Sequence, residues 1–170
     1  EDSLVPQHSL GVYLDVLTQV TSIPVLVLPG TAAHPKDISG TTVQKTMVVA
    51  DHISGDSRLI NYGARFCPNG GTLWLWHVED DAVLGRITDA FERIPEIDSE
   101  TGRKLLERQL LKEASDYIQT CVEELKKDRP RIACESRVVT GHFLKQYSML
   151  IEEAGIDLLV ANTKDEDQLA

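Results

Sequence analysis

The feature that most constrains the fold is a strand segment that comes too early in the chain. Residues 23–30 read Ile-Pro-Val-Leu-Val-Leu-Pro-Gly, which is typical of a buried strand that closes a parallel sheet. They precede residues 46–51, which read as the strand that opens such a sheet. The strand expected over 156–161 is followed by no further predicted helix or strand. The chain thus offers a closing strand near its start and an open sheet edge near its end.

The segment between these two points alternates strands with helices. Such alternation indicates right-handed βαβ units and a parallel sheet. A turn or loop with some helix is expected over the acidic stretch 79–98, and an exposed linker over 29–45. Helices are expected over 10–22, after Asp51 with Ser54 or Asp56 as the N-cap, over 99–127 and over 143–154; strands are expected over 23–28, 46–51, 72–78, 132–139 and 156–161.

Composition narrows the function classes. The chain has 170 residues, which suits one α/β domain, and a net charge of −10, which disfavours nucleic-acid binding. No apolar run approaches the roughly 20 residues that span a bilayer, so no direct membrane contact is expected. Cys67, Cys121 and Cys134 are widely spaced and show no CxxC pattern, so we expect neither a disulfide framework nor a zinc site. A reducing, cytoplasmic location fits best.

Several stretches together resemble the universal stress protein family. Met47–Ser54 looks like the opening strand of that family, and Leu73–Val78 looks like its second strand. Val138–Gly141 and Ala154–Val160 look like its third and fourth strands, and Gly11–Val27 resembles the closing helix and strand. The resemblance implies a doubly wound α/β fold: an open five-stranded parallel sheet with helices on both faces, whose closing unit here comes from the N-terminus.

The inverted order predicts a domain organisation. Residues 1–30 would be the closing helix–strand unit, either the tail of a preceding tandem domain or a permuted part of this one. Residues 31–45 would be the linker, and 46–170 the universal-stress-like α/β domain. The linker is long enough for residues 23–28 to pair within the chain, or with a second copy as a domain swap. Because the sequence begins with Glu1 and not with Met, we expect a fragment, or the ordered part, of a longer protein, and the inverted order is most simply explained by two such domains in tandem.

Many members of the family bind ATP, so the resemblance also implies candidate nucleotide-binding residues. Asp51 matches the family aspartate at the end of the opening strand, and Val78 matches the residue after histidine in the second strand. The glycine-rich loop departs from the family, since Asn162 and Asp165 stand where glycines are expected, and only Gly11 matches a glycine of the phosphate loop. Carboxylates in this loop would repel a polyphosphate. We therefore expect a degenerate site, with Asp51 acting as an N-cap.

Other residues with reactive or aromatic side chains each have a functional and a structural interpretation. Trp74 and Trp76 share one face of a strand and could stack on a base, but core packing is the simpler interpretation. His77 and His142 could act as acid or base, but no serine or cysteine partner is identifiable. The acidic groups at 79–81 and 165–167 would follow two strands and could bind a cation, although adjacent loop carboxylates are usually just solvated. No metal site is therefore predicted.

These observations lead to one leading hypothesis and two alternatives. The leading hypothesis is a non-enzymatic universal stress protein domain that acts through a homodimer or a tandem partner domain, with no bound cofactor. The first alternative is an ATP- or AMP-binding stress sensor of the same fold. The second is a cytosolic regulatory domain of a membrane transporter.

Overall fold

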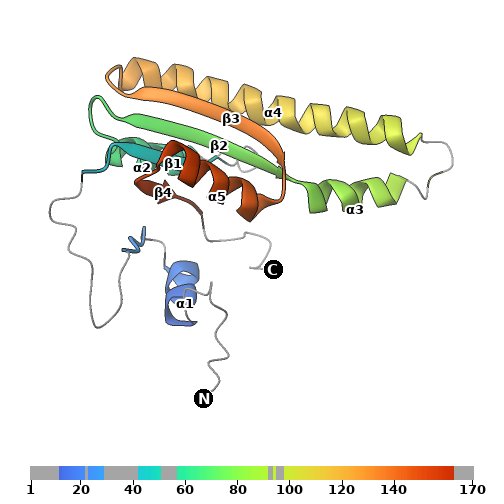
Figure 1. Ribbon diagram of the computed structural model, residues 1–170, viewed down its shortest axis with the longest axis horizontal. Coiled ribbons are helices and arrows are strands. Elements are labelled where there is room, and N and C mark those ends of the chain that lie inside the picture. The colour runs from blue at the N-terminus through green and yellow to red at the C-terminus, as the bar shows by residue number, and fades with distance from the viewer. Residues whose placement is uncertain are drawn as a thin grey trace. The chain divides into compact units, whose positions relative to one another are not determined.

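The computed structural model describes residues 12–21, 23–28, 42–50, 57–91, 94 and 98–162. They fall into two units, the larger covering Thr42–Ala161 and the smaller Glu1–Thr41 together with Asn162–Ala170. Figure 1 shows the elements in chain order. They are α1 (Val12–Val20), β1 (Lys45–Val49), α2 (Arg58–Phe66), β2 (Thr72–Asp80), α3 (Asp81–Phe91), α4 (Ser99–Asp128), β3 (Ala133–Gly141), α5 (Phe143–Ala154) and β4 (Leu158–Val160).

The larger unit is built on a parallel sheet of four strands in the order β3-β2-β1-β4. In the register, Lys45 lies opposite Thr72 and Val49 opposite Trp76, while β4 pairs only with Thr46–Val48 on the other side of β1. β2 and β3 are longer and stay paired as far as Asp80 and Gly141. The expected α/β class with a parallel sheet is therefore confirmed.

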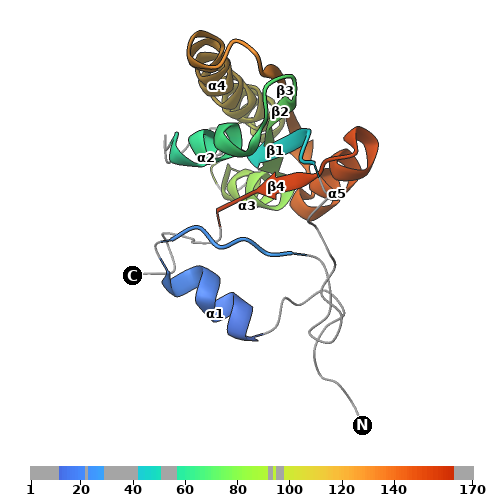
Figure 2. The ribbon, with the colours of Figure 1, turned by 90° about the vertical axis from the view of Figure 1, so that its left-hand side faces the viewer.

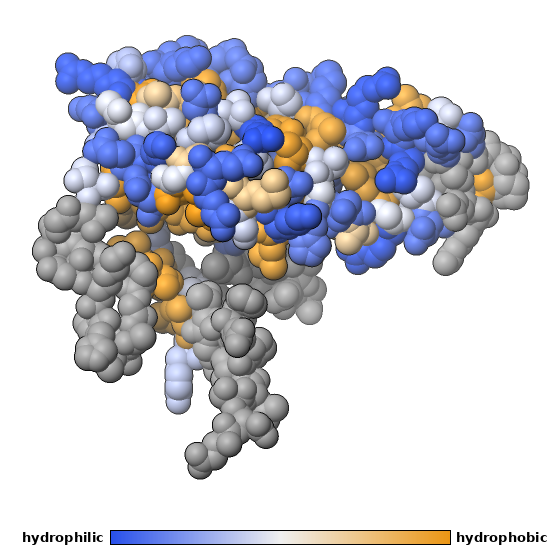
Figure 3. Space-filling model, in the orientation of Figure 1, coloured by the Kyte–Doolittle hydropathy of each residue, from blue (hydrophilic) through white to orange (hydrophobic). Residues whose placement is uncertain are grey.

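The core lies in two layers because successive strand residues point to opposite faces. Val48, Leu73 and Leu75 belong to one cluster of buried residues, to which α2 and α4 contribute. Met47, Trp76 and Val78 belong to a second cluster, to which α5 contributes Tyr147 and Leu150. In Figure 2, α2 and α5 lie on opposite sides of the strands. Figure 3 shows that the surface along α4, away from the sheet, is mainly hydrophilic.

Most predicted elements are present, with differences at their ends. The helix expected over 143–154 is α5, which ends at Gly155 in the left-handed conformation (φ 62°) that glycine adopts without strain. The acidic stretch expected to be a loop with some helix contains α3. The N-cap of α2 is Ser57, so the expected N-caps, Ser54 or Asp56 and also Asp51, are wrong, and the helix begins further along the chain. β4 covers only three of the residues expected over 156–161.

The fifth strand expected over residues 23–28 is not observed. These residues are among those that the structure describes, and they form no strand and pair with none of the four strands. They follow α1 in the smaller unit, and several of their apolar side chains are exposed. The closing role of this segment stays a prediction.

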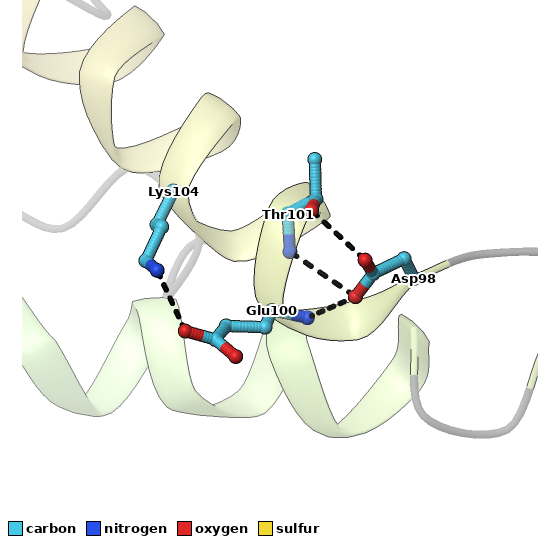
Figure 4. Close-up of polar contacts among 4 residues, drawn as sticks. All are labelled: Asp98, Glu100, Thr101 and Lys104. Carbon is cyan, nitrogen blue, oxygen red and sulfur yellow. Dashed lines mark hydrogen bonds and ion pairs between the residues drawn. The ribbon is translucent and has the colours of Figure 1, made fainter.

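α4 begins at a well-formed N-cap, shown in Figure 4. Asp98 Oδ1 accepts hydrogen bonds from the backbone N–H groups of Glu100 and Thr101, and its Oδ2 accepts one from the Thr101 hydroxyl at 2.9 Å. The Thr101 hydrogen bonds, first the side-chain one, lower the pKa of the Asp98 carboxyl. Lys104 pairs with Glu100 at 2.6 Å one turn along. The cap satisfies orphan N–H groups and explains why the 30-residue helix starts here.

A close approach between α2 and β1 requires a glycine at position 63. A Cβ added to Gly63 would overlap Val48 Cγ2, and Val48 is fully buried in the sheet. A Cβ added to Gly85 in α3 would meet nothing within 4 Å. The two glycines therefore form a matched pair, one packed against the sheet and one in open space.

We predict opposite effects of alanine at these two positions. Gly63→Ala should lower the free energy of unfolding by about 1–2 kcal/mol, because overpacking outweighs the gain in helix propensity. Gly85→Ala should raise it by about 0.5–1 kcal/mol. Urea unfolding followed by tryptophan fluorescence measures both. Equal stabilities of the two variants would contradict the packing of α2 on β1.

β4 is joined to the start of β1 by a carboxylate. Asp157 Oδ2 accepts hydrogen bonds from the backbone N–H groups of Gln44 and Lys45, both at 2.9 Å, and these two bonds lower the pKa of the Asp157 carboxyl. The Asp157 N–H donates to Lys45 O, and Lys45 Nζ donates to Ala154 O. These bonds hold the short strand in register.

We predict a pH-dependent contribution from Asp157. Because its pKa is lowered on folding, its stabilising effect is complete above the ordinary value of about 4 and is lost as the pH falls below it. Asp157→Asn should lower the free energy of unfolding at pH 7 by less than about 1 kcal/mol, since the group is largely solvated. The difference from the parent chain should shrink towards pH 3. Asp89→Asn, at an exposed position of α3, is the control. A difference that grows on acidification would refute the role.

Candidate functional site

The strand order places a candidate crevice at the carboxyl ends of β1 and β4. In an open parallel sheet, ligands bind where neighbouring strands connect in opposite directions, and in the order β3-β2-β1-β4 this point lies between β1 and β4. Asp51 follows β1, but residues 51–56 lie outside the described residues, as do Gly11 and Asp165–Asp167. Asn162, two residues after β4, is described and exposed. Most of the loops expected to hold a nucleotide are thus not placed by the structure.

The described part of this edge is formed by the end of β2. The paired part of β1 ends at Val49, opposite Trp76, and the Ala50 N–H still donates to Trp76 O at 2.8 Å. β2 continues past this point to Asp80, paired on its other side with β3. Val78 is 4% exposed and packs in the cluster with α5, so only its backbone is available to a ligand at this edge.

His77 holds the end of β1 in place. Its Nδ1 lies 2.9 Å from Ala50 O, and its Nε2 lies 3.3 Å from Glu79 Oε2. A carbonyl oxygen only accepts, so Nδ1 carries the hydrogen of the first bond. A carboxylate also accepts, so the second contact requires a proton between Nε2 and Oε2. His77 and Glu79 are both buried, and His77 holds Ala50, the residue that precedes Asp51, in place.

The acidic group at 79–81 has structural partners. Glu79 faces His77, and Asp80 Oδ1 accepts a hydrogen bond from the Ala82 N–H at 2.8 Å, which caps the start of α3. Among the described residues, no three histidine, cysteine, aspartate or glutamate side chains gather as they would around a metal ion. The other expected acidic group, at 165–167, lies outside the described residues.

The two tryptophans pack in the core. Trp76 is 2% exposed, and Trp74 packs against the same cluster beside α5. The Arg137 guanidinium of β3 lies 4.9 Å from the Trp76 ring centroid, and Arg137 Nη1 is 3.9 Å from Glu153 Oε2. These contacts agree with the core interpretation and leave the Trp76 ring no open face for a stacked base. His142 is the N-cap residue of α5, without a side-chain cap bond.

The structure brings together three cysteines that the sequence keeps apart. Cys67 and Cys121 are buried in the cluster shared with α2 and α4, and Cys134 packs against it. Burial is the main cause that raises the pKa of each of the three thiols. A raised pKa leaves little thiolate at neutral pH, so these side chains act as core residues and are poor nucleophiles. Sequence spacing could not reveal this cluster, because its members come from three different elements.

None of the described helices is both long enough and apolar enough to cross a membrane. The 30-residue α4 has the length but carries charged side chains along its course.

Comparisons with known proteins bear on the fold. No protein-family model and no curated protein matches the chain. Among solved structures, the chain is similar to hypothetical protein MJ0577, with 15% identity and a TM-score of 0.53 over 70% of this chain and 73% of that one. It is similar to hypothetical protein PH0823, with 21% identity and a TM-score of 0.51 over 70% and 75%. At these identities the likeness shows a shared α/β fold alone, which is consistent with the universal stress protein fold expected from the sequence.

Proposed function

We propose that the chain is a universal-stress-type α/β domain that works by assembly and has no enzymatic activity of its own. One observation carries the proposal: on the side of β4 away from β1, the described residues include no pairing strand. An open strand edge presents unpaired backbone N–H and C=O groups, which proteins cover by pairing with another strand. The domain would act through a homodimer or a tandem partner.

The segment 23–28 supports this proposal from the sequence side. Leu26, Val27 and Leu28 are each about half exposed, and Ile23 is 73% exposed. Apolar residues at this density are costly to leave in water, at roughly 25 cal/mol per Å² of apolar surface. Strand pairing would bury this segment and cover the open edge together. We propose that residues 23–28 add to the edge of β4, either within one chain or between two copies.

We further propose that this carboxyl edge binds no ATP. The residues of β2 that extend beyond its pairing with β1 are His77–Asp80, and two of them carry carboxyl groups. Asn162 and Asp165 stand where the family pattern has glycines. Phosphate groups need close backbone approach and positive charge, which this combination does not offer. We also propose that the protein is located in the cytoplasm.

An ATP- or AMP-binding sensor is the second candidate. It is favoured by the geometry of β2, whose backbone at Val78 lies beyond its pairing with β1 and one strand away from the point where the strand order reverses. The adenine of a nucleotide needs such backbone donors and acceptors in a protected crevice. Nucleotide binding therefore has to be measured together with assembly.

We predict that the purified chain forms dimers whose stability depends on residues 23–28. Sedimentation equilibrium should show a concentration-dependent dimer, and Leu26→Lys should weaken dimerisation by at least about tenfold, because a lysine desolvated in a strand interface is costly. Leu105→Lys is the matched control, since Leu105 is also an exposed leucine but lies on α4. A monomer at every concentration would refute the homodimer. Equal weakening by both substitutions would refute the assigned surface.

We predict that ATP, with or without Mg²⁺, shows no saturable binding that depends on Asp51. Isothermal titration calorimetry of the parent chain and of Asp51→Ala should give the same result. Binding by the parent chain that is lost in Asp51→Ala would establish the nucleotide sensor in place of the leading proposal.

A further inference from the structure

A cavity of about 340 Å³ lies between α2 and the end of α4, apart from the site discussed above. Arg129 belongs to the segment that leads into the amino end of β3, and Cys67, next to α2, leads into β2. The carboxyl ends of the strands, where a nucleotide site is expected, are at the opposite end of the sheet from these amino ends. The lining residues are Arg58, Asn61, Tyr62, Ala64, Arg65, Leu125, Asp128 and Arg129.

The charge of this cavity is opposite to that of the whole chain. Its lining carries three arginines and one aspartate, a balance of +2, whereas the chain as a whole has a net charge of −10. Clustered positive charge on an acidic protein creates a local field that concentrates anions, especially where low-dielectric walls surround it. The volume lies in the range of small-molecule sites.

Two of the arginines are not neutralised by the described residues around them. Arg65 lies over the Tyr62 ring, with its guanidinium carbon 5.9 Å from the ring centroid. Arg129 Nη2 donates to Cys67 O at 3.4 Å, which uses one of its five N–H groups. Within the described part of the chain, neither guanidinium has a carboxylate within 4 Å. Both retain N–H donors for a ligand.

We propose that this α2–α4 cavity binds a small, multiply charged phosphate anion, of which inorganic pyrophosphate is the simplest example. Guanidinium groups bind phosphate oxygens through paired N–H donors, and two from different helices can hold two phosphoryl groups. The Asn61 amide adds two further donors. The Tyr62 ring and Leu125 form the apolar part of the wall. The Asp128 carboxylate lowers the positive electrostatic potential of the cavity, so that ligands of low charge are attracted less strongly.

A purely structural role for the arginines predicts a different outcome. Arg65 lies in the last turn of α2, and Arg129 is the C-cap residue of α4, where positive charge offsets the helix dipole. If that were their whole role, their removal would lower stability without affecting any ligand. Anion titration separates the two roles.

The test is a titration with sodium pyrophosphate at constant ionic strength, followed by calorimetry and by amide NMR shifts. The parent chain should bind in a saturable manner, with the largest shifts at Asn61, Tyr62 and Arg65, and chloride should give none. The double variant R65Q/R129Q should bind at least about tenfold more weakly, since two charge-assisted donors are lost. R86Q/R103Q is the control, because it removes the same charge from exposed positions on α3 and α4. It should bind like the parent chain.

A second variant keeps the test decisive if R65Q/R129Q folds poorly. Among the described residues the Arg65 side chain makes no hydrogen bond, so R65Q alone should weaken pyrophosphate binding while the thermal unfolding midpoint stays close to that of the parent chain. Non-saturable shifts, equal weakening in R86Q/R103Q, or binding of a phosphorylated peptide but not of pyrophosphate would each overturn the proposal. Asp51→Ala should leave pyrophosphate binding unchanged, so the outcome is independent of the assembly and nucleotide proposals.

Discussion

The architecture of the larger unit depends on the burial of β1 on both faces. Met47 and Val48 have no exposed surface, and they point into the two different core clusters. A strand of this kind must have neighbours on both sides and helices to cover it, or its apolar side chains and backbone would face water. β2 and β4 pair with it, α2 packs against it so closely that Gly63 has no room for a Cβ, and Asp157 ties β4 to its first residues.

The same constraint shapes the carboxyl edge of the sheet. β1 ends at Val49 while β2 and β3 continue, so no described strand pairs with β2 on that side beyond Trp76. The His77 ring takes over part of that role by bonding to Ala50 O, and Glu79 contacts the ring from the same strand. His77, which could be taken for a catalytic residue in the sequence, therefore helps to hold the end of β1 in place.

The chain separates its charges in a way that bears on ligand choice. The carboxyl edge carries acidic side chains, whereas the cavity between α2 and α4 concentrates arginines at the ends of two helices. Clustered arginines attract anions and carboxylates repel them, which supports the cavity as the proposed anion site. The cavity lies between α2 and α4, and α4 packs against β2 and β3, whereas the open edge belongs to β4 on the other side of β1.

Local sequence patterns were sufficient for most elements. Helical spacing predicts α4, Gly155 ends α5, and runs of apolar residues mark the parallel strands, because these signals act within a few residues. The resemblance based on strand motifs likewise pointed to an α/β fold with a parallel sheet. Strand ends were less predictable: β2 runs on to Asp80 because β3 pairs with it there, and β4 is short and pairs only with Thr46–Val48 of β1.

Only the tertiary structure decided which distant residues meet. The clustering of Cys67, Cys121 and Cys134, the bond from His77 to Ala50 and the arginine cavity all join residues from different elements. No local pattern encodes such contacts, since they depend on how helices pack across a sheet. For the early apolar segment at 23–28, the local sequence pattern is clear but the tertiary contact is not shown by the structure. The sequence by itself determined that it is apolar and predicted a strand, whereas the pairing of a strand depends on a partner edge, which is a property of the assembled fold.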